Sequence, residues 1–334
     1  MQKGRRAFMR PIALGAASAL LFAVTFVLNR GMELAGGSWL WSASLRYFFM
    51  VPLLLLLVGA RGRLRPLFRE MRLRPGSWLL WSFVGFGLFY APICFAAAYS
   101  PGWLTAGVWQ ITIVSGSLLV PFFYETVMTA EGARRRRQKL PLRGLALSLI
   151  ILAGVALMQI GYASPLHGGE AWLGVLAVAA ASFAYPLGNR KMMELCGGRL
   201  DAYQRVLGMT IASLPFWLLL AVLGWTMEGP PSGGQLLQTL LIAVFAGVAA
   251  TVLFFHATDL ARGSTEKMAS VEATQSLEVL FAAGGETLLL GSAYPSPVSW
   301  IGTGVVMAGM VLHSYASRQR SGSFRTDRAE AKEG

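Results

Sequence analysis

Long apolar runs, separated by short polar segments, fill most of this chain of 334 residues. In lipid the backbone has to satisfy its own hydrogen bonds, so a run of about 20 apolar residues forms a helix. The sequence predicts ten such spans, at 11–30, 38–58, 77–99, 103–125, 142–162, 171–188, 203–225, 236–256, 268–290 and 298–316. We therefore expect an all-α integral membrane protein with ten transmembrane helices.

The composition agrees with this fold class and argues against a soluble domain. Only 13% of the residues are charged and 55% are hydrophobic, whereas soluble domains carry roughly 25% charged residues. The apolar run that follows Lys3 to Arg10 resembles a secretory signal, but another long apolar run comes directly after it, so we interpret it as an uncleaved first helix. Cys94 and Cys196 are the two cysteines of the sequence, and two cysteines imply no disulfide framework.

The net charge of +13 would suggest nucleic-acid binding in a soluble protein, but its distribution favours another explanation. Of the 29 Lys and Arg residues, 27 fall at the two termini or in every second loop, and Arg30 and Arg46 are the exceptions. Lys and Arg favour the cytoplasmic side of a membrane. We expect a multi-pass protein of the cytoplasmic (inner) membrane with both termini cytoplasmic, and we expect no nucleic-acid partner.

A repeated segment divides the chain into two halves. Residues 29–37 (NRGMELAGG) and 189–198 (NRKMMELCGG) are identical at seven of nine positions when one residue is inserted. The offset of 161 residues between Glu33 and Glu194 also matches Gly102 with Gly263, and Glu125-Thr126 with Glu286-Thr287. The repeat therefore relates the first helix to the sixth and the fourth to the ninth.

Because each unit holds five helices, an odd number, the second must run through the membrane in the opposite direction. We expect two inverted five-helix repeats, at 11–162 and 171–316, followed by a basic cytoplasmic tail at 317–334. Inverted repeats are typical of secondary transporters, in which the substrate site lies near the membrane midplane between the halves. Duplication for a scaffold or a membrane enzyme is the alternative.

Several stretches carry a family resemblance over about residues 10–316. They are Phe26–Gly37, Ala96–Gly107, Val271–Glu286 and Gly302–Tyr315. On these residues the chain resembles the drug/metabolite transporter superfamily in its ten-helix, EamA-like form, and more narrowly its multidrug resistance efflux branch. In that superfamily the fourth and ninth helices commonly contain a proline and end in Gly-Glu. This sequence departs from that pattern at two positions. Glu278 stands near the usual proline position of the ninth helix, and Glu125 of the fourth follows Tyr124 instead of glycine. The resemblance implies a transporter rather than an enzyme.

The ninth span holds the candidates for proton or substrate binding: Glu272, Gln275 and Glu278. Ionisable groups inside a bilayer are costly and mark functional sites by default. Glu278 is expected near the bilayer centre, where it would be alternately protonated or paired with a cationic substrate, as proton antiport requires. The alternatives are a buried pair with Arg46 or a hydrogen bond to a neighbouring helix. Glu272 and Gln275 share a helix face nearer the cytoplasm, where Glu272 could equally be an interfacial residue.

Arg46 and the fourth span supply the remaining candidates. Arg46 lies too far inside the second span to reach water easily, so we expect either an acidic partner or an anionic group of the substrate. Trp109, Gln110 and Ser117 could line a pocket for an organic cation, with a cation–π contribution from Trp109. Serine and threonine in membrane helices also serve helix packing, which is the alternative for Ser117.

Other chemistry finds no support in the sequence. The three histidines, His167, His256 and His313, show no metal-ligand spacing, and we expect no metal, no cofactor and no ATP-driven step. For Glu125 and Glu286, a shared role in anchoring helix ends is expected.

The leading hypothesis is a secondary active transporter that exports a small organic solute or drug-like cation, coupled to protons. The alternative within the same fold is a facilitated exchanger or uptake carrier for an amino acid or other metabolite. A membrane enzyme or lipid-handling protein is the third hypothesis, although no convergent catalytic set supports it. The expected partners are the substrate, the coupling proton and the lipid bilayer, and the sequence leaves the oligomeric state open.

Overall fold

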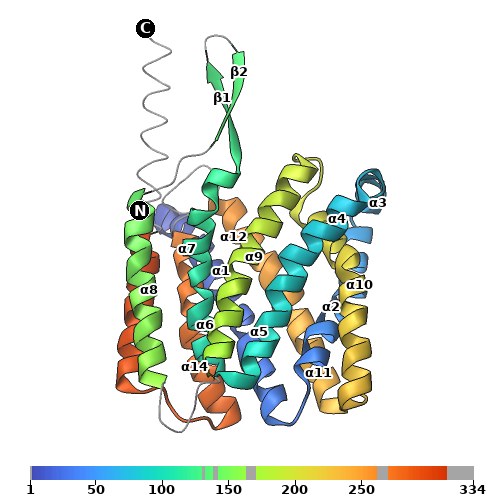
Figure 1. Ribbon diagram of the computed structural model, residues 1–334. Helices are drawn as coiled ribbons and strands as arrows, with labels where there is room; N and C mark the ends of the chain where they lie inside the picture. The colour runs from blue at the N-terminus through green and yellow to red at the C-terminus, as the bar shows by residue number, and fades with distance from the viewer. Residues whose placement is uncertain (1, 130–131, 138–141, 163–170, 262–269, 314–334) are drawn as a thin grey trace.

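The computed structural model describes the chain except for residues 1, 130–131, 138–141, 163–170, 262–269 and 314–334, so the predicted basic tail lies outside the described residues. Helices stand side by side in one bundle, and a two-stranded hairpin projects from one end (Figure 1). The first half contains α1 (Gln2–Leu34), α2 (Trp39–Gly59), α3 (Leu64–Leu73), α4 (Pro75–Ser82), α5 (Leu88–Tyr99), α6 (Gly102–Trp109), α7 (Ile111–Leu118) and α8 (Leu142–Tyr162). The second half contains α9 (Ala171–Cys196), α10 (Ala202–Glu228), α11 (Gly233–Ile242), α12 (Thr251–Ala261), α14 (Leu277–Leu290) and the helix Pro297–His313.

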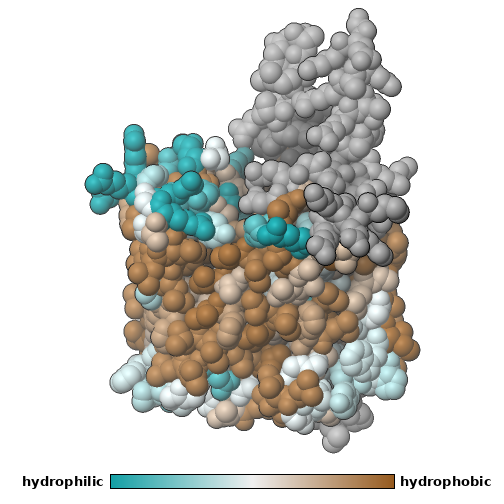
Figure 2. Space-filling model, turned by 180° about the vertical axis from the view of Figure 1, so that it is seen from behind, coloured by the Kyte–Doolittle hydropathy of each residue, from teal (hydrophilic) through white to brown (hydrophobic). Residues whose placement is uncertain are grey.

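Seven helical segments among the described residues are long and apolar enough to cross a membrane. They are Met9–Leu34, Trp39–Gly59, Pro75–Tyr99, Leu145–Tyr162, Trp172–Cys196, Ala202–Glu228 and Gly233–Thr258. Apolar side chains form a broad belt across the face shown in Figure 2, and hydrophilic residues collect above and below this belt. A surface of exposed leucines such as Leu56 and Leu176 is stable in lipid and not in water. The chain is therefore a multi-pass membrane protein.

The other three predicted spans are shorter or interrupted helices. The fourth is divided at Gln110 into α6 and α7, and the ninth contains a 3₁₀ turn, Thr274–Ser276, directly before α14. The last is the apolar helix Pro297–His313. Glu278, which the sequence placed in the middle of a continuous helix, instead lies in the first turn of α14.

The end of the predicted span 103–125 is wrong. After α7 a 3₁₀ turn, Val120–Phe122, leads into strand β1 (Tyr124–Thr129), which pairs antiparallel with β2 (Gly132–Arg137). Proline within the 3₁₀ turn cannot continue an α-helix, and the following Tyr, Val and Thr residues favour a strand. Glu125 therefore lies opposite Arg136 in a hairpin rather than at a helix end, and the described fold is not purely helical.

Two long helices that share the repeated segment run in opposite directions. In Figure 1, α1 descends from the end of the bundle that carries the hairpin, whereas α9 ascends towards it. Each ends at glycine in the left-handed region, Gly36 with φ 77° and Gly197 with φ 52°, which only glycine adopts without strain. The repeated glycines thus serve as helix C-caps.

Close helix contacts bring the halves together. Gly188 of α9 lies against the backbone of Gly85, and a Cβ atom on Gly188 would collide with that backbone. Gly154 of α8 meets Gly302 of the helix Pro297–His313 in the same way. Small residues at helix crossings replace the hydrophobic driving force that lipid does not supply.

Candidate functional site

Irregular helical geometry marks the middle of the bundle. Residues Phe83–Gly87, between α4 and α5, form a π-helical segment, and so do residues Ala243–Ala250, between α11 and α12. The break at Gln110 and the 3₁₀ turn before α14 add two further interruptions. Such segments inside longer helices frequently occur at functional sites, so the side chains around them are candidates for a binding site.

Arg46 points into the protein from the buried half of α2. Only 8% of its surface is exposed, and its guanidinium lies 4.1 Å from the ring centroid of Tyr90 and 5.9 Å from that of Tyr47. It forms no ion pair with a described carboxylate, and its Nε is buried without a hydrogen-bond partner there. The acidic partner that the sequence suggested for Arg46 is therefore not present among these residues.

Four helices build the wall against which Arg46 is stacked. The Asn29 amide of α1 and the Tyr90 hydroxyl of α5 exchange hydrogen bonds of 3.3 and 3.4 Å. Tyr47 stacks on Trp217 of α10 with ring centroids 4.2 Å apart and planes 10° from parallel. Because every member of this wall is buried, it fixes the orientation of the guanidinium.

A second group of aromatic rings joins this wall to the ninth span. Phe89, Trp109 and Tyr185 come from α5, α6 and α9, and their ring centroids are 4.7 to 5.4 Å apart. We call these three rings the aromatic triad. Trp109 of the triad belongs to α6, which packs on α14, the helix that carries Glu278.

Glu278 is the acidic member of this region. Its side chain is 6% exposed and lies in the first turn of α14, directly after the 3₁₀ turn. It forms neither an ion pair nor a hydrogen bond with another described residue. Arg46 and Glu278 are thus oppositely charged residues in one buried region that do not pair with each other.

The remaining sequence candidates lie elsewhere or serve local contacts. Gln110 is buried and donates to the Ala106 carbonyl at 3.1 Å, while Ser117 donates to the Ile113 carbonyl and contacts His313 at 3.3 Å. Gln275 donates to the Gly15 carbonyl and to Ser18, which ties the 3₁₀ turn to α1. The side chain of Glu272 is exposed, whereas that of Glu278 is buried.

Sequence reasoning missed Tyr90, Tyr185 and Asn29. Tyrosines in apolar runs give no signal by themselves, but Asn29 opens the repeated segment and could have been found there. Its neighbour Arg30 donates to the carbonyls of Ala97 and Ala98 at the end of α5. The equivalent Arg190 donates to the Gly116 carbonyl in the last turn of α7, so both repeated arginines hold helix C-termini.

Glu286 has a structural partner that the sequence did not identify. It is 1% exposed and accepts a hydrogen bond of 3.2 Å from the backbone N–H of Trp103 in the first turn of α6. A carboxylate at this position satisfies an N–H group that the helix itself leaves free. Glu286 therefore differs from Glu278, which has no such partner.

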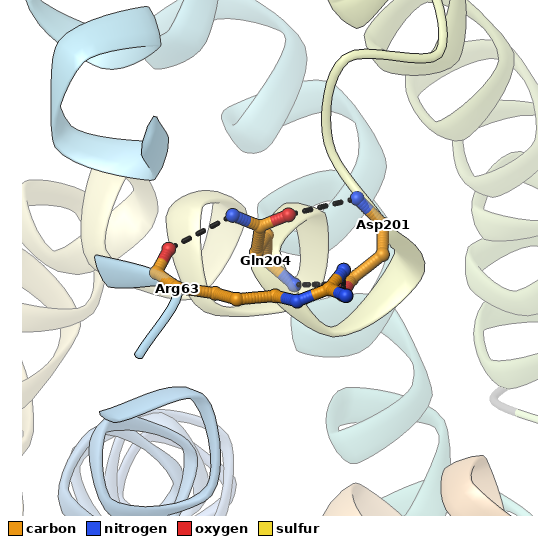
Figure 3. Close-up of polar contacts among 3 residues, drawn as sticks. All are labelled: Arg63, Asp201 and Gln204. Carbon is orange, nitrogen blue, oxygen red and sulfur yellow. Dashed lines mark hydrogen bonds and ion pairs between the residues drawn. The ribbon is translucent and has the colours of Figure 1, made fainter. Parts of the chain in front are cut away.

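At the end of the bundle that carries the hairpin, polar contacts join the two halves of the chain. Arg63 forms an ion pair of 2.9 Å with Asp201, and Gln204 donates to the Arg63 carbonyl (Figure 3). Asp201 and Gln204 also form a capping box at the start of α10. Nearby, Arg199 makes a two-pronged contact with Glu70 of α3, at 2.8 and 3.0 Å. We call these contacts the end clamp.

Comparison with known proteins gives a consistent family match. Residues 9–319 match the EmrE family, described as "Putative multidrug resistance efflux transporter". A Bacillus subtilis protein, "Uncharacterized protein YjlA", is 56% identical over 312 residues, which cover 93% of this chain and 96% of that protein. A Shouchella clausii protein, "Uncharacterized 42.1 kDa protein in intracellular alkaline protease 3'region", is 46% identical over 274 residues, covering 82% and 71%.

A solved structure, "Crystal structure of protein", resembles the whole chain. It superposes with a TM-score of 0.59 over 92% of this chain and 98% of its own. At 18% identity this likeness shows the fold alone.

Proposed function

Because this chain belongs to the EmrE family of multidrug resistance efflux transporters, we propose that it is a secondary active transporter of the cytoplasmic membrane that exports a small organic solute in exchange for protons. The family resemblance expected from the sequence is confirmed over nearly the whole chain. One observation carries the proton-coupled mechanism: Glu278 is a buried carboxylate that forms no ion pair or hydrogen bond with another residue of the described part of the chain.

The proposed architecture is ten transmembrane helices in two inverted repeats, 11–162 and 171–316. The opposite directions of α1 and α9 support it (Figure 1). The π-helical segments support it as well, because the repeat offset of 161 residues carries Phe83–Gly87 into Ala243–Ala250. In this arrangement the basic end of the bundle, where α3 and the end clamp lie, faces the cytoplasm.

Packing between helices is consistent with the same symmetry. The repeat exchanges α1 with α9, and α5 with the segment made by α11, its π-helical continuation and α12. Accordingly α5 packs on α9, and α12 packs on α1. The pairs α2 with α10 and α6 with α14 each join equivalent helices of the two halves. A transporter built this way can expose one central site to either side by moving one half against the other.

Proton coupling would depend on Glu278. A charged carboxylate in the membrane interior is costly without a partner, so it is stabilised either by binding a proton or by a cationic group of the solute. If proton and solute bind there in alternation, a proton gradient drives the solute outward. The alternative carrier, a facilitated exchanger or uptake system for an amino acid or other metabolite, would not need Glu278 to release its proton.

Transport in proteoliposomes with an imposed pH gradient tests this function. The solute is chosen from a library by its ability to raise the thermal unfolding temperature, Tm, of the purified protein. We expect Glu278→Gln to lose gradient-driven transport, while exchange driven by the solute gradient alone continues. Glu272→Gln is the matched control, because Glu272 is an exposed glutamate of the same span.

Two results would count against this assignment. If Glu278→Gln transports at the full gradient-driven rate, Glu278 is not the coupling group. If the unmodified protein moves solute with no dependence on the pH gradient, it is a facilitated carrier.

A further inference from the structure

We propose that the Arg46 guanidinium binds an anionic group of the transported solute, and that this solute is a small organic carboxylate with an apolar or aromatic body. The inference rests on the proposed transport function and names the substrate class. It departs from the drug-like cation that the sequence suggested, because the buried Arg46 has no carboxylate partner among the residues that the structure describes.

The first step is the unusual environment of Arg46 compared with other described arginines. Arg63 and Arg199 have carboxylate partners, and Arg30 and Arg190 have backbone carbonyls at helix ends. Arg46 is buried against the side chains of Tyr90 and Tyr47 and has neither kind of partner among the described residues. A buried charge without a compensating partner is strongly unfavourable. The presence of Arg46 is therefore explained by an anionic ligand that binds and dissociates.

The groups that face Arg46 supply no negative charge. They are the Tyr90 and Tyr47 phenols and the Cys94 thiol, all of which are ordinarily neutral at pH 7. Glu278 forms no ion pair with Arg46. The counter-charge is therefore missing from the part of the chain that the structure describes.

The guanidinium of Arg46 has N–H groups that no described carboxylate occupies. Its central carbon lies over the Tyr90 ring, 4.1 Å from the ring centroid. Those N–H groups form the fork that binds carboxylates in a bidentate manner. The buried Nε without a partner belongs to this fork. Tyr90, held by Asn29, thus presents the fork in a fixed orientation.

The surroundings of the fork indicate the rest of the solute. Phe89 of the aromatic triad lies 6.0 Å from Tyr90, so the triad continues from the wall that holds Arg46. Its rings would pack against an apolar or aromatic body. A cation without an anionic group would be repelled by Arg46, whereas a zwitterion could place its ammonium group towards Glu278.

Three matched ligands test the charge requirement: 3-phenylpropanoate, phenylalanine and phenethylamine. They share one ring and differ in carrying a carboxylate, both charges or an ammonium group alone. We expect the two carboxylates to raise the Tm of the unmodified protein and phenethylamine to leave it unchanged. In Arg46→Gln, affinity for the two carboxylates should fall at least about 30-fold, because the buried carboxylate of the ligand loses the arginine as its partner.

Arg46→Lys is the second variant and retains the charge in case Arg46→Gln does not fold. It should bind the carboxylates more weakly than the unmodified protein, since lysine lacks the fork. The inference is overturned if phenethylamine binds as well as the carboxylates, if neither carboxylate binds, or if neither substitution changes carboxylate binding. A carboxylate that binds through Arg46 but is not moved across the membrane of proteoliposomes would overturn the transport function instead, leaving the site in place.

Discussion

Arg46 and Arg199 are the same side chain in two opposite settings. Arg199 lies at the end of the bundle, where its side chain is 50% exposed and makes two hydrogen bonds to Glu70. Arg46 lies in the interior at 8% exposure and forms no ion pair with any carboxylate of the described residues. Arg199, which water can reach, therefore has a carboxylate partner, whereas Arg46, which is shielded from water, has none among the described residues.

This contrast separates structural from functional charges. An exposed pair joins two surface segments and contributes little to stability, because water competes for both partners. An unpaired buried charge lowers stability and needs a reason other than folding. Glutamates show the same division, since Glu70 is paired at the surface, whereas the buried Glu278 has no ion-pair or hydrogen-bond partner in the described parts of the chain.

The largest expected effect comes from removing the buried charge. Arg46→Leu should raise the Tm of the solute-free protein in detergent, with a gain of about 1–4 kcal/mol in unfolding free energy, the range seen when buried ions are replaced by apolar side chains. Arg199→Leu is the control and should lower the Tm slightly. A clear fall of the Tm in Arg46→Leu would mean that Arg46 holds the fold together, and the contrast with Arg199 would disappear.

A smaller effect distinguishes the two buried glutamates of α14. Glu286→Ala leaves the Trp103 N–H without its acceptor, so the unfolding free energy should fall by about 1–3 kcal/mol. Glu278→Ala removes no hydrogen bond and should cost less. Thermal unfolding of both variants in the same detergent measures the difference. Equal losses would indicate that Glu278 has a structural partner after all.

Much of the architecture could be predicted because hydropathy and loop charge depend on local sequence. The predicted span 142–162 coincides with α8, and the second span differs from α2 by one residue at each end. Interruptions within helices were not predicted, since π-helical and 3₁₀ segments leave the apolar pattern unchanged. The hairpin was missed because the chain stays apolar up to Phe123, where the helical geometry has already ended.

For the site, the sequence could identify residues whose burial in a membrane is energetically unfavourable, but it could not identify the residues that they contact. Polar and aromatic groups inside apolar spans are candidates for a function, which is why the sequence identified Arg46, Glu278 and Trp109. Whether Arg46 contacts a carboxylate or a tyrosine ring depends on how α2, α5 and α9 pack against one another. Local sequence patterns do not predict this packing. Glu272 illustrates the limit, because it lies close to Glu278 in sequence yet has an exposed side chain.

The smallest expected effect concerns the paired side of the comparison. Hydrogen bonds from Arg199 hold the pKa of Glu70 below its ordinary value of 4.5, against a weaker opposing effect of burial. A lowered pKa means that the pair stabilises the end clamp above the ordinary pKa and is lost only as the pH falls through the lower value. The contact should therefore remain intact from neutral pH down to 4.5.

Spin labels at the exposed positions Leu73 of α3 and Met193 of α9 can follow this contact by their distance distribution. We expect a narrow distribution that broadens only in stronger acid, and a broader one at every pH in Glu70→Gln. The broadening should be limited, because Arg63 and Asp201 still join the same two segments. A distribution that widens above pH 4.5, or that Glu70→Gln leaves narrow, would show that Arg199 and Glu70 do not hold these segments together. In that case the ion pair between Arg199 and Glu70 would have no structural role, and the contrast with Arg46 would no longer separate a structural charge from a functional one.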